Sequence, residues 1–104
     1  MPKPVTIAGM AFPSEQAAIR HCREILDRDQ PGTEVTGPDA EFVEALFCVR
    51  ADKLLNLHGL NVIRYLRDTE PGPLSRTLCF WAELEDGTLV DFSFVTAIDL
   101  LAGG

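Results

Sequence analysis

Residues 77–94 decide the fold, and they read TLCFWAELEDGTLVDFSF. Two apolar runs rich in β-forming residues flank Asp86-Gly87, a pair typical of the two-residue type I′ turn of a β-hairpin. Such a turn fixes the register of the two strands. The predicted pairs are Glu85 with Thr88, Leu84 with Leu89, Glu83 with Val90, Ala82 with Asp91 and Trp81 with Phe92.

This register assigns each side chain to a face, because side chains alternate across a strand. One face is predicted to hold Cys79, Trp81, Val90, Phe92 and Phe94, and the other Leu78, Phe80, Ala82, Leu84 and Leu89. Apolar residues on both faces indicate that helices cover one face and that something partly covers the other. Ser93 is suited to cap a short helix over 94–101, which is a candidate for that second cover.

Two helices are expected before the hairpin. Ser14-Glu15 predicts the start of the first, which should stop before Pro31-Gly32. Its apolar residues recur with helical spacing: Ala18, Ile19, Cys22, Ile25 and Leu26. Gly37-Pro38-Asp39 opens the second, whose expected buried face is Phe42, Val43, Leu46 and Phe47. A short helical turn should follow from Ala51-Asp52, with Gly59 ending it.

The fold class follows from the order of these segments. Strand-like runs occur at 5–8, 60–67, 77–84 and 88–92. The sequence therefore predicts one α+β domain over residues 1–104, the size of a single domain. Two main helices should pack on a small, mainly antiparallel sheet in the order β-α-α-β-β-β, with room for a short C-terminal helix.

Charge opposes non-specific binding to nucleic acid. The chain has 9 Lys and Arg against 16 Asp and Glu, a net charge of -7, whereas such binding depends on cations that displace counterions from phosphates. A local basic surface stays open as an alternative, which would join Arg20 and Arg23 of the first helix with Arg64, Arg67 or Arg76 of the strands. The sequence has no transmembrane run and no secretory signal, so we expect a cytoplasmic protein without a membrane partner.

Motifs for chemistry are lacking. Cys22, Cys48 and Cys79 form no C-x-x-C pair, so we interpret them as buried structural thiols rather than metal ligands. Neither a Gly-rich dinucleotide loop nor a P-loop is present. We therefore expect no catalytic residue, no metal and no cofactor. The enzyme alternative needs His58, Asp91 and a cysteine within hydrogen-bond reach in one cleft.

The predicted aromatic face, with Trp81, Phe92 and Phe94, has two interpretations. Aromatic side chains on a sheet can stack RNA bases, but this hairpin carries four carboxylates and no Lys or Arg. We therefore favour a role in the core or in an interface, and an exposed patch would mark a protein partner or a homodimer.

The chain resembles the Defective Chloroplasts and Leaves (DCL) family between residues 12 and 98. The resemblance is carried by Phe12-x-Ser14-x-x-Ala17 and by Asp86-Gly87-x-x-Val90-Asp91-Phe92-Ser93-Phe94, whose last four residues match the family signature. Two departures are Ala51-Asp52, near where the family has His-Pro, and Val95-Thr96, where it has basic residues. The resemblance implies an association with RNA processing, because plant members are linked to chloroplast ribosomal RNA maturation and a similar domain ends the largest subunits of plant-specific RNA polymerases. It implies no active site.

The first functional hypothesis is thus a non-catalytic accessory domain that binds RNA or a ribonucleoprotein protein partner. The alternative is a protein–protein interaction module without nucleic-acid contact, either a monomer or a weak homodimer.

Overall fold

A computed structural model describes residues 3–55, 57–72, 74 and 76–103. In chain order its elements are β1 (Val5–Ile7), β2 (Met10–Phe12), α1 (Glu15–Asp27), β3 (Thr33–Val35), α2 (Pro38–Val49), α3 (Ala51–Leu55), β4 (Val62–Thr69), β5 (Leu78–Leu84), β6 (Leu89–Phe92) and α4 (Phe94–Leu101). Strands β3-β4-β5-β6 form one antiparallel sheet in that order, and β1 pairs with β2 in a second. The α+β class is confirmed, whereas β2 and β3 are additions to the predicted order.

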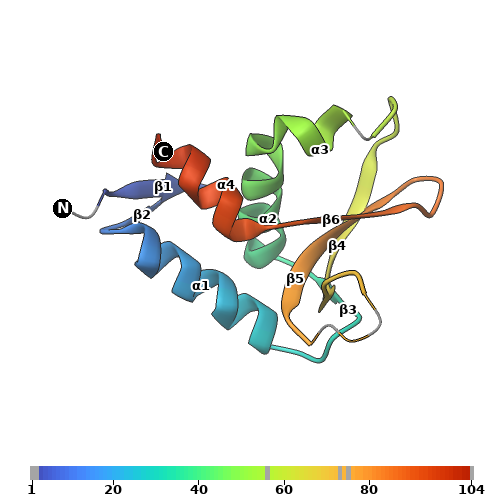
Figure 1. Ribbon diagram of the computed structural model, residues 1–104, viewed down its shortest axis with the longest axis horizontal. Helices are drawn as coiled ribbons and strands as arrows, with labels where there is room; N and C mark the ends of the chain where they lie inside the picture. The colour runs from blue at the N-terminus through green and yellow to red at the C-terminus, as the bar shows by residue number, and fades with distance from the viewer. Residues whose placement is uncertain (1–2, 56, 73, 75, 104) are drawn as a thin grey trace.

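The helices form one layer on one side of the four-stranded sheet. Figure 1 shows α1, α2 and α4 together on that side, with no helix of the described ranges on the other. α1 packs against β5, α2 packs against β4, and α4 packs against both of these helices. The fold is therefore a two-layer arrangement, and we call the side of the sheet without a helix of the described ranges the open face. Its side chains are mostly partly exposed, but Cys79, on the same face, is only 4% exposed.

Both main helices begin where the sequence predicts. The Ser14 side chain accepts a hydrogen bond from the Ala17 N–H at 3.2 Å and caps α1, which satisfies one of the free donors at its first turn. Pro38 stands in the first turn of α2, after Gly37 with φ +65°. The predicted apolar stripes of both helices are buried in the core.

The hairpin between β5 and β6 contradicts the predicted register by one residue. Phe80 pairs with Phe92, and Trp81 pairs with Asp91 rather than with Phe92. The connection has three residues, because the Leu84 N–H donates to the Thr88 carbonyl at 2.8 Å and the Gly87 N–H donates to the Leu84 carbonyl at 2.9 Å. A type I′ turn needs positive φ at both central residues, but only Gly87 of this loop has it.

This shift changes which side chains share a face. Phe80, Ala82 and Leu84 of β5 face the helices together with Val90 and Phe92 of β6. Trp81 lies on the other face, so the predicted grouping of Trp81, Phe92 and Phe94 is wrong. Phe92 and Phe94 are buried in the core, with 1% and 8% of their surfaces exposed.

The last helix occupies 94–101 as predicted, and Ser93 caps it by accepting a hydrogen bond from the Thr96 N–H at 3.3 Å. Its position differs from the expectation. Because α4 packs on α1 and α2, it completes the helical layer and does not cover the second face of the sheet.

Candidate functional site

The open face of the sheet carries one continuous row of side chains across all four strands. Glu34 of β3 pairs with Leu66 of β4, Leu66 pairs with Trp81 of β5, and Trp81 pairs with Asp91 of β6. We call these four residues the central row. It places two partly exposed apolar side chains between two carboxylates.

A second row borders the central row. Arg64 pairs with Glu83, and Glu83 pairs with Leu89. The Arg64 guanidinium lies 3.5 Å from the Glu83 carboxylate and 3.8 Å from the Glu34 carboxylate. Leu89 is 48% exposed. The open face therefore continues its mixture of apolar surface and carboxylates beyond the central row.

The charge of the open face is negative. Its carboxylates are Glu34, Asp68, Glu83 and Asp91, and Arg64 is the one cation on β4 that shares this face with them. Arg64 is already within ion-pair distance of two of these carboxylates. The remaining negative potential favours cationic partners and repels phosphates.

The Trp81 indole has a defined orientation. Its Nε1–H donates a hydrogen bond to the Thr69 carbonyl oxygen at 3.1 Å. The polar edge of the ring is thereby satisfied by the end of β4, and its remaining surface is apolar and partly exposed. A large aromatic ring held in one orientation loses little conformational entropy on binding, which is typical of interface anchors.

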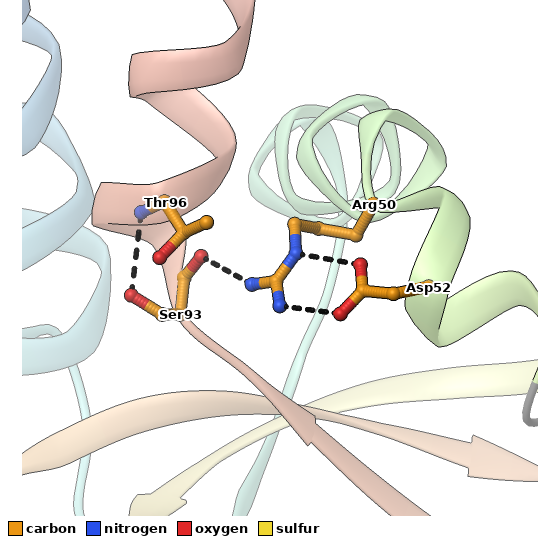
Figure 2. Close-up of polar contacts among 4 residues, drawn as sticks. All are labelled: Arg50, Asp52, Ser93 and Thr96. Atoms are coloured by element: carbon orange, nitrogen blue, oxygen red, sulfur yellow. Dashed lines mark hydrogen bonds and ion pairs between the residues drawn. The ribbon is translucent and has the colours of Figure 1, made fainter.

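The corner between β6 and α4 is held by a buried arginine, as Figure 2 shows. Arg50, at the end of α2, donates through Nε and Nη2 to the Asp52 carboxylate at 3.1 and 2.9 Å, and through Nη1 to the Ser93 carbonyl at 3.2 Å. The hydrogen bonds from Arg50 lower the pKa of Asp52. The link fixes the end of β6, and with it Asp91 of the central row.

The structure does not bring the five predicted arginines together. Arg64 lies on the open face, and Arg67 points to the other side with only 4% of its surface exposed. The buried Arg67 Nε has no hydrogen-bond partner among the described residues. Arg20, Arg23 and Arg76 are exposed. Arg23 and Arg76 line a common cavity, whereas Arg64 and Arg67 lie on opposite faces of the sheet and cannot both belong to one basic surface.

The groups of the enzyme alternative are brought together only in part. Cys79 and Asp91 line the same cavity, but His58 lines neither of the cavities that contain Cys79. Burial raises the pKa of Cys79 to about 12, so its thiol stays protonated near neutral pH. A thiol held in that form is a poor nucleophile.

The prediction of three buried thiols is correct for two of them. Cys22 and Cys79 are buried, whereas Cys48 is exposed on α2. No group of three or more His, Cys, Asp or Glu suited to hold a metal ion occurs within the part of the chain that the structure describes.

The four residues of the predicted family signature have separate positions. Asp91 lies on the open face, Phe92 and Phe94 lie in the core, and Ser93 caps α4. Three of the four therefore have a structural role in the corner. Only Asp91 is part of the candidate site.

Sequence reasoning missed Glu34 and Leu66 of the central row, and also Arg50. A signal for Glu34 exists, because the β-forming Thr33-Glu34-Val35 stands between Gly32 and Gly37. Its three residues are too few to show an alternating pattern. Nothing in the local sequence identifies Arg50, since one of its partners lies 43 residues away.

Comparison with known proteins supports the fold. The chain is similar to an uncharacterized protein from Rhodospirillum rubrum known from its solution NMR structure, with 25% sequence identity and a TM-score of 0.77. The match covers 93% of this chain and 89% of that one. No protein-family model matches the chain, and none of the curated proteins does. Each helix in the described ranges is too short or too polar to cross a membrane.

Proposed function

We propose that this domain is a non-catalytic binding module whose open sheet face docks a basic, partly apolar segment of a partner protein. The observation that carries the proposal is the central row, in which Leu66 and Trp81 lie between Glu34 and Asp91. A partly exposed apolar strip with a charged border resembles the composition of a protein interface, which has an apolar centre and a polar rim. Lysine or arginine side chains of the partner would lie against the border, and its apolar side chains against Trp81.

The negative charge of the open face favours a basic protein segment over a nucleic acid or a second copy of the chain. A nucleic acid would place phosphates against Glu34, Asp68, Glu83 and Asp91, which is unfavourable at close range. A second copy of the chain would place the same carboxylates against each other, because a two-fold interface uses the same surface on both copies. A cationic segment is the one partner for which the apolar strip and its border are both favourable.

The association with RNA processing stays a prediction from the resemblance to the DCL family. In the form we propose, the domain reaches RNA through a protein partner and not through its own arginines. Support for this form comes from Arg64, which is engaged by carboxylates, and Arg67, which is buried. The exposed Arg20, Arg23 and Arg76 lie outside the open face, and the RNA measurement below tests whether Arg20 and Arg23 bind RNA directly. Ribonucleoprotein proteins are commonly basic, so they are suitable candidates for the open face.

The test uses Trp81, the single tryptophan of the chain, as an internal reporter. The domain is titrated with a hexapeptide of alternating leucine and arginine, and Trp81 fluorescence is recorded at low and at physiological salt. We expect a saturable change that weakens as salt rises. A hexapeptide of alternating leucine and glutamate should cause no saturable change.

Matched variants identify the surface. Asp91→Asn and Glu34→Gln should each lower the affinity for the leucine–arginine hexapeptide by about 2- to 5-fold, since an exposed ion pair contributes less than about 1 kcal/mol. Asp99→Asn removes the same charge from the exposed surface of α4 and should leave the affinity within error. Equal losses in all three variants, or tight binding of the leucine–glutamate peptide, would contradict the proposal.

Two further measurements separate the alternatives. Light scattering should give a monomer at high concentration, and a dimer lost in Leu66→Glu would show instead that the open face binds a second copy. Anisotropy with single-stranded RNA at low salt should show weak binding. Tight RNA binding that requires Arg20 and Arg23 would replace the proposal with direct RNA contact.

A further inference from the structure

A cavity lies at the end of the sheet, where α1, the start of β5 and the first turn of α4 meet. Its volume is about 340 Å³, and residues of all three elements line it. This volume is at the lower end of the range for small-molecule pockets. None of the four residues of the central row lines it, so it is separate from the docking surface proposed above.

Two arginines reach this cavity from different segments. Arg23 projects from α1, and Arg76 stands just before β5. Neither takes part in any of the ion pairs found among the described residues. By contrast, Arg64 and Arg50 have carboxylate partners. The two guanidiniums are thus available as donors to a bound anion, for which the planar arginine fork is well suited.

The remaining walls are mostly apolar. Leu26 from α1, Leu78 from β5 and Phe94 from α4 line the cavity, and Cys79 is also among its lining residues. A ligand that fits these walls needs an apolar body next to its charged group.

Two carboxylates limit the charge of that ligand. Asp27 and Glu70 line the same cavity as the arginines, so the formal charge of the lining is balanced. A group with two negative charges, such as a phosphate monoester, would be repelled by these carboxylates more strongly than a single carboxylate would.

We propose that this cavity binds a small organic monoanion, a carboxylate carried on an apolar chain or ring. Arg23 and Arg76 hold the carboxylate, and Leu26, Leu78 and Phe94 enclose the apolar body. The proposal does not rest on the open face and stands or falls separately from it.

The test is an NMR titration of the ¹⁵N-labelled domain with hexanoate, with 1-hexanol as the uncharged match and with inorganic phosphate. Hexanoate should cause saturable shifts of amides around the cavity, including those of Thr77 and Val95, which also line it. Hexanol and phosphate should bind at least about tenfold more weakly, since charged hydrogen bonds and apolar contact are both needed.

The variants Arg23→Gln and Arg76→Gln should each lower the affinity for hexanoate about tenfold. Both side chains are exposed, so the amide spectrum of each variant should otherwise match that of the unchanged protein. Arg20→Gln is the matched control, because Arg20 lies one turn earlier on α1, is exposed and does not line the cavity. It should bind hexanoate normally.

Several results would overturn the proposal. Equal affinity for hexanol would show apolar binding without anion recognition, and an equal loss in Arg20→Gln would show a general effect of charge. Tighter binding of phosphate would contradict the ligand class, and the lack of saturable shifts near the cavity would contradict the site.

Discussion

The Arg50 guanidinium donates a hydrogen bond to the Ser93 carbonyl oxygen at 3.2 Å and joins segments 43 residues apart in sequence. Arg50 is 9% exposed, and its other donors are directed at Asp52. The end of α2 and the corner before α4 are therefore held by one side chain, as Figure 2 shows. This link stabilises the edge of the open face from the helical layer.

Replacement of Arg50 tests this link. Arg50→Met should lower the free energy of unfolding by about 1–3 kcal/mol, because a buried charged hydrogen bond is lost. Urea unfolding measures the change. Arg28→Met is the control, since the ion pair of Arg28 with Asp39 is half exposed and should contribute less than about 1 kcal/mol. Equal losses in the two variants would contradict a special role for Arg50.

The loop of the β5–β6 hairpin gives a second prediction. Gly87 has φ +89°, and a Cβ there would meet nothing within 4 Å. Gly87→Ala should therefore cost about 1 kcal/mol of stability from backbone strain alone. Gly87→Asn should cost less, because Asn tolerates the left-handed region. Thermal unfolding compares the variants, and an unchanged stability in Gly87→Ala would exclude this loop conformation.

The three cysteines should differ in reactivity. Burial raises the pKa of both Cys22 and Cys79 to about 12, whereas Cys48 is exposed. Iodoacetamide at neutral pH should therefore alkylate one thiol per folded chain, and mass spectrometry should locate it at Cys48. Rapid alkylation of Cys22 without unfolding would contradict the burial of α1 against the core.

The same pKa values predict a loss of stability in alkali. Between the ordinary value of 9.0 and about 12, the unfolded chain releases the proton of Cys22 while the folded chain retains it. Deprotonation therefore favours the unfolded state, and stability should fall as pH rises above about 9. Urea unfolding from pH 8 to 10.5 measures the slope. Cys22→Ala should reduce the slope and leave the contribution of Cys79, and an unchanged slope would assign the effect to other groups.

The open face should distinguish cations from anions. Relative to their quenching of free N-acetyltryptophanamide, caesium should quench Trp81 fluorescence more effectively than iodide at low salt, because Asp91 and nearby carboxylates attract cations. Asp91→Asn should reduce this difference, whereas Asp99→Asn on α4 should not. Stern–Volmer plots give the comparison, and an iodide-to-caesium ratio above that of the free analogue would contradict a negative open face.

Local patterns explain why the helices could be predicted. The apolar stripe of α1 and the cap at Ser14 are written within one segment, as are Pro38 and the buried face of α2. These features depend on the spacing of neighbours along the chain. The buried residues of both helices could therefore be predicted from the spacing of apolar residues, without knowledge of tertiary contacts.

The hairpin register shows the limit of such patterns. Asp86-Gly87 is compatible with a two-residue loop and also with a three-residue loop that places glycine in the left-handed region. The observed loop is the longer one, in which the Asp86 carboxylate accepts a hydrogen bond from the Thr88 N–H at 2.9 Å. One residue of difference moves Trp81 to the face opposite Phe92.

The candidate site is formed by pairing between strands that are distant in sequence, and local sequence patterns do not predict this pairing. The central row joins Glu34 to Leu66, and these residues meet only because the short strand β3 pairs with β4. The separation of the predicted arginines follows from the same alternation, because Arg64 and Arg67 point to opposite faces of β4.

The most direct test of docking on the open face is an amide footprint of the leucine–arginine hexapeptide on the ¹⁵N-labelled domain. We expect the largest shifts on Leu66, Trp81 and Asp91, while amides of the helical layer around Arg20 and Arg23 remain in place. Shifts centred on α1, or spread evenly over the domain, would contradict docking on the open face of the sheet.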